Sequence, residues 1–184
     1  MKKYLLGMTC VMASAIGFLM LAGCTTAPPT AQGKTDIRED ARIALTKAQA
    51  NDPTLTGVLH AAAGYAVFPS IGKGAAGIGG AYGKGVLFVN GKSVGYCDLS
   101  QASIGAQLGG QSYTEIICFS DADSVTRFQQ GKCRFDAQAT AVALKSGAGA
   151  DAKYRDGVAV FTMDETGLMA EAAIGGQDFS YQAR

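Results

Sequence analysis

The chain has 184 residues, of which 16 are Lys or Arg, 15 are Asp or Glu and 25 are Gly, and 48% of its residues are apolar. This length suits one domain with its own core and is short for two ordinary domains. The formal net charge of +1 lacks the basic excess of nucleic-acid-binding proteins, so no nucleic-acid partner is expected. The apolar fraction argues against a disordered chain.

Residues 1–23 show, in order, the features of a bacterial lipoprotein signal. Lys2 and Lys3 give a positive start, an apolar run extends to Leu21, and small residues precede Cys24. The Cys24 thiolate is the nucleophile that accepts a diacylglycerol group. The apolar run of about 17 residues is short for a retained membrane-spanning helix. We therefore expect a signal peptide at 1–23 and lipidation at Cys24; a plain secretory signal is the alternative.

The residues after the cysteine predict a location and a domain boundary. The residue directly after Cys24 is Thr25 and not an aspartate. In this respect the chain resembles enteric lipoproteins that are sorted to the outer membrane. We expect a cell-envelope protein, anchored by its lipid to the outer membrane and facing the periplasm; retention at the inner membrane stays open. Residues 24–35 are polar and contain Pro28 and Pro29, which predicts a lipidated tether before a single domain at 36–184.

Three cysteines remain in the exported chain, namely Cys97, Cys118 and Cys133. Three is an odd number, so at most one disulfide can form, and the pair stays open. Cys97 and Cys118 lie in apolar, strand-like runs, where packed thiols are the alternative. The chain has no Cys-x-x-Cys pair among them and a single His, so we expect neither a metal site nor a cofactor.

Helices are expected early in the domain. A capping pair and apolar residues at helical spacing predict a helix over 36–51. A second, short helix is expected over 52–62, because Pro53 suits a first helical turn. The run 121–130 predicts a third helix, which opens with Asp caps and ends before a glycine.

From Gly64 onward the pattern changes to strands. Strand-like runs lie at 65–68, 71–85, 86–89, 93–97, 102–110, 114–119, 158–163, 168–174 and 179–181. Asn90-Gly91 is typical of a β-hairpin turn, residues 164–167 resemble a second turn, and 134–145 is ambiguous between helix and strand. These elements predict an α+β fold: N-terminal helices, then a strongly bent antiparallel sheet of six to eight strands. Closure of the sheet into a barrel stays open.

Thirteen of the 25 glycines fall between Gly64 and Gly110. Glycine weakens a strand, so its presence indicates a bend, a bulge, or the close approach of another backbone or a ligand. Of these interpretations, we favour bends, which let a small sheet curl, and we consider contact with a ligand the less favoured alternative. A membrane-inserted glycine zipper at 74–83 is a further alternative. Lys73 and Lys84 limit that stretch to a length that cannot span a bilayer as a helix.

Two short motifs suggest enzymes but lack the required context. Residues 72–77 match GxGxxG, yet the glycine-rich residues that follow do not favour the helix that a dinucleotide site needs. Ser93 lies in a GxSxG match, but it follows a hairpin turn, and the single histidine, His60, precedes it in the chain. We therefore predict that the protein is not an enzyme.

Several sequence blocks occur in a fixed order within the domain. They are GYAVFP at 64–69, GGAYGKGV at 79–86, AQLGGQSY at 106–113, IICF at 116–119 and VTRF at 125–128. In this order they resemble the SYLF domain family in its bacterial lipoprotein branch. The resemblance continues more weakly to the end of the chain, so it covers most of the domain.

The SYLF resemblance implies binding to phosphoinositides or other anionic lipids. Bacterial members often carry an actin-binding label, but actin is not expected as a partner of an exported lipoprotein. In eukaryotic members an N-terminal amphipathic helix grips membranes. The helix expected at 36–50 takes a similar place, with Arg38, Arg42 and Lys47 as membrane-facing candidates, although its mixed charge weakens that grip. Glu115 lies near an acidic position of fungal relatives in a different context, and no role is assigned to it.

Anionic head groups bind Lys or Arg near backbone amides, which glycine-rich turns expose. Lys73 and Lys84 bracket the glycine-rich segment, so Lys73, Gly74, Tyr82 and Lys84 are candidate lipid-binding residues. Solvated lysines at strand ends are the alternative. The expected function is that of a lipid-anchored envelope protein whose domain binds membrane phospholipids. The alternative is a structural or protein-interaction lipoprotein whose domain has no lipid-binding activity and whose protein partner is unknown.

Overall fold

The computed structural model describes residues 26–133, 141–144, 147–151, 153–164 and 176–184. The expected signal peptide, the lipidation site Cys24, most of the ambiguous segment 134–145 and the strand expected at 168–174 lie outside these residues. No helix in the described ranges has the length and apolar character needed to cross a membrane.

Three α-helices are described: α1 (Ala31–Asn51), α2 (Leu55–Ala61) and α3 (Ala122–Gln129). The first helix starts at Ala31 rather than at 36, because the Thr30 hydroxyl accepts a hydrogen bond from the Gly33 amide at 3.0 Å and caps it. The last residues of the expected tether therefore belong to α1. The start of α3 is as expected, since the Asp121 carboxylate accepts from the Ser124 amide at 2.8 Å.

Two long strands dominate the sheet. β1 (Gly64–Val89) and β2 (Lys92–Phe119) pair antiparallel along almost their whole length, joined by a turn at Asn90 and Gly91. Both turn residues have positive φ angles, of 51° and 71°, as Asn-Gly hairpin turns require. Each long strand unites three of the short runs seen in the sequence. The six to eight strands expected therefore appear as five in the described residues.

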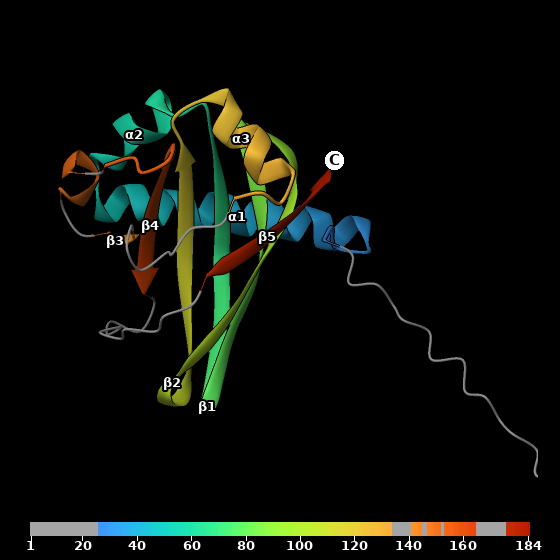
Figure 1. Cartoon of the computed structure of the whole chain (residues 1–184). Helices are drawn as coiled ribbons and strands as arrows, with labels where there is room; N and C mark the ends of the chain where they lie inside the picture. The colour runs from blue at the N-terminus through green and yellow to red at the C-terminus, as the bar shows by residue number, and fades with distance from the viewer. Residues whose placement is uncertain (1–25, 134–140, 145–146, 152, 165–175) are drawn as a thin grey trace, which may run out of the picture.

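The α+β class and the strongly bent sheet are confirmed. The later half of β2 pairs with β4 (Val158–Asp164), and its earlier half pairs with β5 (Gln177–Ala183), both antiparallel. The short β3 (Ala141–Ala143) joins β4 in parallel, and the described sheet stays open instead of closing into a barrel. Figure 1 shows β1 and β2 running down together, bending, and returning.

Glycine is required where β1 folds back along itself. A Cβ atom at Gly85 would lie 2.6 Å from the Val67 carbonyl oxygen, and one at Gly83 would lie 3.0 Å from that of Ser70. Real Cβ atoms do not approach backbone oxygen so closely, so the two halves of β1 lie together only because these residues lack one. Of the reasons considered for the glycines, close approach of another backbone therefore applies at Gly83 and Gly85.

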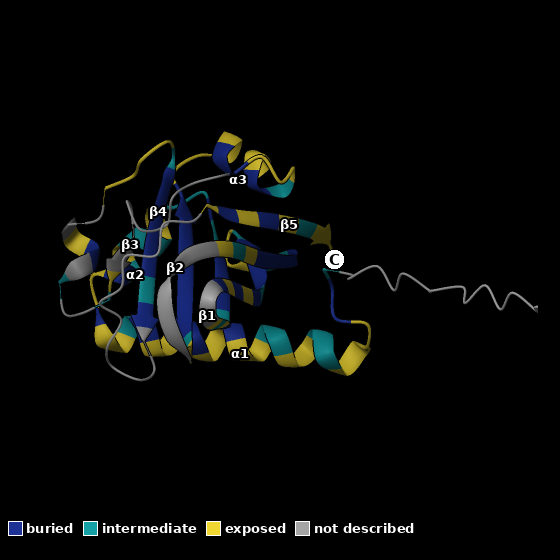
Figure 2. Cartoon of the chain, turned by 60° about the horizontal axis from the view of Figure 1, so that its bottom comes forward, coloured by how far each residue is buried: buried dark blue, intermediate teal, exposed yellow. Residues whose placement is uncertain are grey.

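Helices cover both faces of the sheet, with α1 on one side and α3 on the other (Figure 2). On the α1 side, Ala41, Leu45 and Ala48 pack against apolar strand residues such as Phe88 and Phe161. On the α3 side, aromatic rings meet one another at centroid distances of 5.0 to 5.9 Å; they belong to Phe68, Phe119, Phe128 and Phe179. Each face of the sheet is therefore partly covered by a helix.

A buried carboxylate fixes the junction after α1. Asp52 accepts hydrogen bonds from the Thr54 amide and hydroxyl and from the Gly147 and Gly149 amides. Burial raises its pKa, but these hydrogen bonds outweigh burial and hold the pKa below the usual value. Asp52 is thus a structural group that ties the turn at 147–151 to the helices.

All three cysteines of the domain are buried free thiols. Cys97 and Cys118 lie within opposite core clusters, so the packed-thiol alternative holds for both. Burial raises the pKa of Cys118 to about 12 and raises that of Cys97 as well.

Candidate functional site

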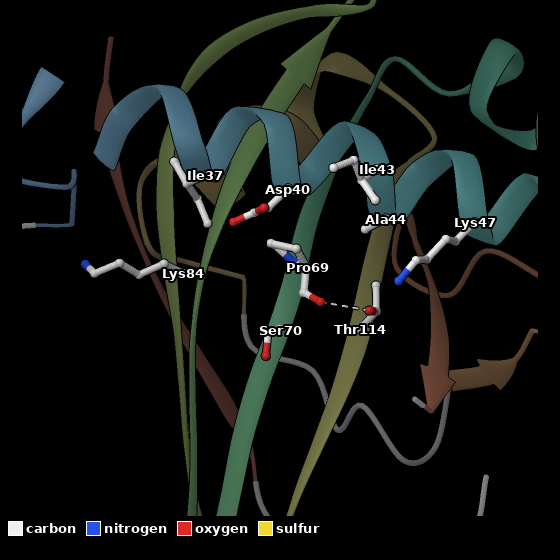
Figure 3. A pocket seen from close by; sticks show the side chains of 9 residues that line it. All are labelled: Ile37, Asp40, Ile43, Ala44, Lys47, Pro69, Ser70, Lys84 and Thr114. Atoms are coloured by element: carbon white, nitrogen blue, oxygen red, sulfur yellow. Dashed lines mark hydrogen bonds between the residues drawn. The ribbon is translucent and has the colours of Figure 1, made fainter. Parts of the chain in front are cut away.

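An open groove of about 310 Å³ runs between α1 and the sheet (Figure 3). Its apolar lining comes from Ile37, Ile43 and Ala44 of α1 and from Pro69 of β1. Ile43 is 46% exposed, although it lies on a helix whose other large apolar residues are more buried. An apolar side chain left exposed beside a groove is typical of a binding surface.

The groove lies where the β1–β2 pairing is interrupted. Pro69 and Ser70 occupy a shift in register between Phe68 and Ile71. Proline has no N–H group to donate to a neighbouring strand, so an irregularity at this point follows from the sequence. The Thr114 hydroxyl donates instead to the Pro69 carbonyl at 2.8 Å (Figure 3). The floor of the groove therefore carries a proline ring and a hydroxyl in place of regular strand pairing.

Charged side chains lie along the groove. Asp40 and Lys47 come from α1 and are exposed, and Lys84 comes from β1. The Lys84 ammonium donates to the Asp98 carboxylate at 3.0 Å, so part of its charge is balanced within the protein. Burial alone would lower the pKa of Lys84, but its hydrogen bonds and the charge of Asp98 outweigh burial and raise it. Lys84 is therefore cationic at neutral pH.

The lysines predicted as lipid contacts do not all meet at one place. Lys47 and Lys84 both line the groove. Tyr82 is 49% exposed, and the Lys84 ammonium lies 5.8 Å from the centroid of its ring. Lys73 and Gly74 do not line the groove. They follow Pro69 and Ser70 along β1 and pair in register with Gln111 and Gly110 of β2.

The other two basic candidates of α1 differ in their surroundings. Arg38 donates to the Tyr96 hydroxyl at 2.9 Å, so its guanidinium is held against the sheet. Arg42 is exposed on α1 but does not line the groove. Of the predicted membrane-facing residues, Lys47 is thus the one that borders the groove.

Residues 26–28 form a second feature that the sequence did not indicate, here called the N-terminal strap. The Thr26 carbonyl accepts from Lys84 at 3.1 Å, and the Thr26 and Ser180 hydroxyls are 3.0 Å apart. The Ala27 amide donates to the Gln182 side chain at 3.1 Å, and Ala27 is buried. The expected tether is therefore packed onto β1 and β5 from residue 26 onward.

A third feature is a buried polar pair beneath the α3 side of the sheet. The Gln177 amide donates to the Glu115 carboxylate at 2.9 Å, and each residue is only 1% exposed. Among the described residues, the second carboxylate oxygen of Glu115 and the amide oxygen of Gln177 have no hydrogen-bond partner. Burial raises the pKa of Glu115 to about 7, against the smaller lowering effect of the Gln177 hydrogen bond. Burial also raises the pKa of the neighbouring Tyr113, and the negative charge of Glu115 raises the same pKa further.

The GxSxG match at Ser93 lacks the structural context of a nucleophile elbow. Ser93 lies on β2 next to the Asn-Gly turn, and the strand continues after it where a nucleophile elbow would have a helix. His60 is an exposed residue of α2. The groove is therefore the candidate site.

Comparison with protein-family models and with curated proteins found no match for this chain.

Proposed function

We propose that this chain is a lipid-anchored envelope protein whose domain binds anionic phospholipid in the groove between α1 and the sheet. The observation that carries the proposal is the groove itself, which joins an apolar wall containing the exposed Ile43 to the side chain of Lys47, with Lys84 at its other end (Figure 3). A phospholipid has the same two parts, an apolar chain and a phosphate. The resemblance to the SYLF family supports this choice of ligand.

The charges of α1 favour one end of the groove for the phosphate. Asp40 and Lys47 are seven residues apart, which is two helical turns and about 10 Å along the axis. Repulsion from Asp40 places the phosphate near Lys47, where the Thr114 hydroxyl also lines the groove. Ile43, Ala44 and Pro69, which line the groove between Asp40 and Lys47, then contact the acyl chain (Figure 3). The groove volume of about 310 Å³ is at the lower end of the range for ligand pockets.

Vesicle flotation tests this proposal on protein that cannot be acylated, namely residues 24–184 with Cys24→Ser. We expect this protein to float with phosphatidylglycerol vesicles and to float poorly with phosphatidylcholine vesicles. Each cation near an anionic surface contributes about 1 kcal/mol, so the charge reversal Lys47→Glu costs about 2 kcal/mol, or about thirtyfold in partitioning.

The matched control is Lys132→Glu, because Lys132 is an exposed lysine whose amide donates to the Arg127 carbonyl of α3, and α3 covers the other face of the sheet (Figure 2). It should float as the unaltered protein does. Failure to float with either lipid would refute the proposal, as would an equal effect of the two substitutions. Capture of a protein partner without any lipid affinity would favour the alternative of a structural or interaction lipoprotein.

A further inference from the structure

The N-terminal strap joins the start of the described chain to strands that lie far away in sequence. Thr26 and Ala27 contact Ser180 and Gln182 of β5, which are 154 and 155 residues further along, and Thr26 also accepts from Lys84 of β1. Figure 1 shows the N-terminal end of α1 and the end of β5 on the same side of the domain. The strap therefore fixes the point at which the preceding residues leave the domain.

Cys24 is only two residues before Thr26. Two residues span at most about 7 Å even when fully extended. The Cα atom of Cys24, the residue expected to carry the lipid, consequently lies within about 7 Å of the Thr26 Cα atom. The carbonyl of Thr26 accepts a hydrogen bond from the Lys84 ammonium. The same ammonium group lies 5.8 Å from the centroid of the exposed Tyr82 ring.

We propose that the strap orients the domain on the membrane, so that the surface around Tyr82, Lys84 and the first turns of α1 faces the phospholipid bilayer. This inference rests on the lipid anchor of the proposed function. It adds an orientation, because a freely flexible tether would let any face of the domain meet the bilayer.

The chemistry of this surface suits a membrane interface. Tyr82 has an apolar ring with a polar tip, the kind of side chain that is enriched at head-group level. Two further cations lie on the first turns of α1: the Lys34 ammonium lies 5.9 Å from the centroid of the Tyr96 ring, and Arg38 donates to the Tyr96 hydroxyl. Of the acids near this surface, Asp98 is paired with Lys84, whereas Asp36, Glu39 and Asp40 on the first turns of α1 are exposed. The acyl anchor and the ring of Tyr82, rather than net charge, therefore hold this surface at the bilayer.

Single-tryptophan fluorescence tests this orientation, because the chain contains no Trp. The reporter is Tyr82→Trp, and the matched control is Tyr154→Trp. Tyr154 is 37% exposed and lies just before β4. β4 pairs with one end of β2, and β5, which the strap contacts, pairs with the other end. Both are measured in the full acylated protein, with acylation of Cys24 verified by mass, in vesicles that contain brominated phospholipid. We expect bromine quenching of Tyr82→Trp to be at least twofold stronger than that of Tyr154→Trp.

Lengthening the connection separates the strap from direct binding in the groove. An insertion of about ten Gly and Ser residues between Thr25 and Thr26 gives the anchor a mean reach of about 17 Å. The proposal predicts that this insertion at least halves the excess quenching of Tyr82→Trp while the protein stays bound to vesicles. Equal quenching of both reporters, excess quenching that survives the insertion, or an unmodified Cys24 would overturn it. Flotation of the unacylated protein reports on groove binding separately, so the two proposals can fail independently.

Discussion

Replacement of Glu115 by Gln should change how the stability of the protein depends on pH. Burial raises the pKa of Glu115 from its ordinary value of 4.5 to about 7 in the folded protein. Between these two pH values the folded protein keeps a proton that the unfolded chain has lost. The free energy of unfolding therefore falls by up to about 1.4 kcal/mol per pH unit as the pH rises through this window. Over the whole window from pH 4.5 to about pH 7, Glu115 lowers the free energy of unfolding by about 3 kcal/mol.

The Glu115→Gln side chain is neutral throughout and loses this dependence. Its amide nitrogen can take the place of the unpartnered carboxylate oxygen and donate to the amide oxygen of Gln177, which also lacks a partner. We expect the variant and the unaltered protein to have similar stability near pH 4.5, with the variant more stable by up to about 3 kcal/mol above pH 7.

Urea unfolding of both proteins between pH 4.5 and pH 8 measures this difference. The control is Glu39→Gln, at an exposed acid of α1, which should keep the pH dependence of the unaltered protein. Protonation of Glu115 in its buried site would be refuted in either of two cases. The free energy of unfolding of Glu115→Gln could change with pH as steeply as that of the unaltered protein, or the variant could be the less stable of the two at pH 8.

Three further outcomes follow from the packing. Asp52→Ala leaves several buried donors without an acceptor and should lower the free energy of unfolding by about 2 to 4 kcal/mol in urea titrations. Gly85→Ala places a Cβ atom 2.6 Å from a backbone oxygen and should lower the melting temperature sharply; Gly74→Ala, with nothing within 4 Å, should leave it nearly unchanged. The buried thiols of Cys97 and Cys118 should react with a disulfide reagent at pH 8 only when urea unfolds the protein; rapid labelling of the native protein would contradict their burial.

The local parts of the fold were predictable because their causes are local. Asn90 and Gly91 indicate the hairpin turn from their own backbone preferences, and the Asp121 cap marks the start of α3. The clustered glycines indicated bends, bulges or close approach of a backbone or ligand, with bends favoured; close backbone approach occurs at Gly83 and Gly85. The number of strands was harder to predict, because bends and bulges inside β1 and β2 resemble strand ends in the sequence.

Several features of the structure, the groove among them, depend on contacts between distant residues. The buried pair joins Glu115 to Gln177, 62 residues apart, and neither residue type alone indicates burial. The strap joins Ala27 to Gln182 across 155 residues, while its own prolines and polar residues resemble a linker. Lys47 was predicted to face the membrane and Lys84 to bind lipid, and only the packing of α1 on β1 brings them to one groove.

The central claim is that phospholipid occupies the groove between α1 and the sheet. Titration of the ¹⁵N-labelled unacylated protein with a short-chain phosphatidylglycerol, followed by amide chemical shifts, tests it residue by residue. We predict that the shifts concentrate at residues 43–47, 70–71 and 114, and that α3 on the opposite face is unaffected. Spectra that do not change, or shifts confined to α3 and its surroundings, would contradict the claim.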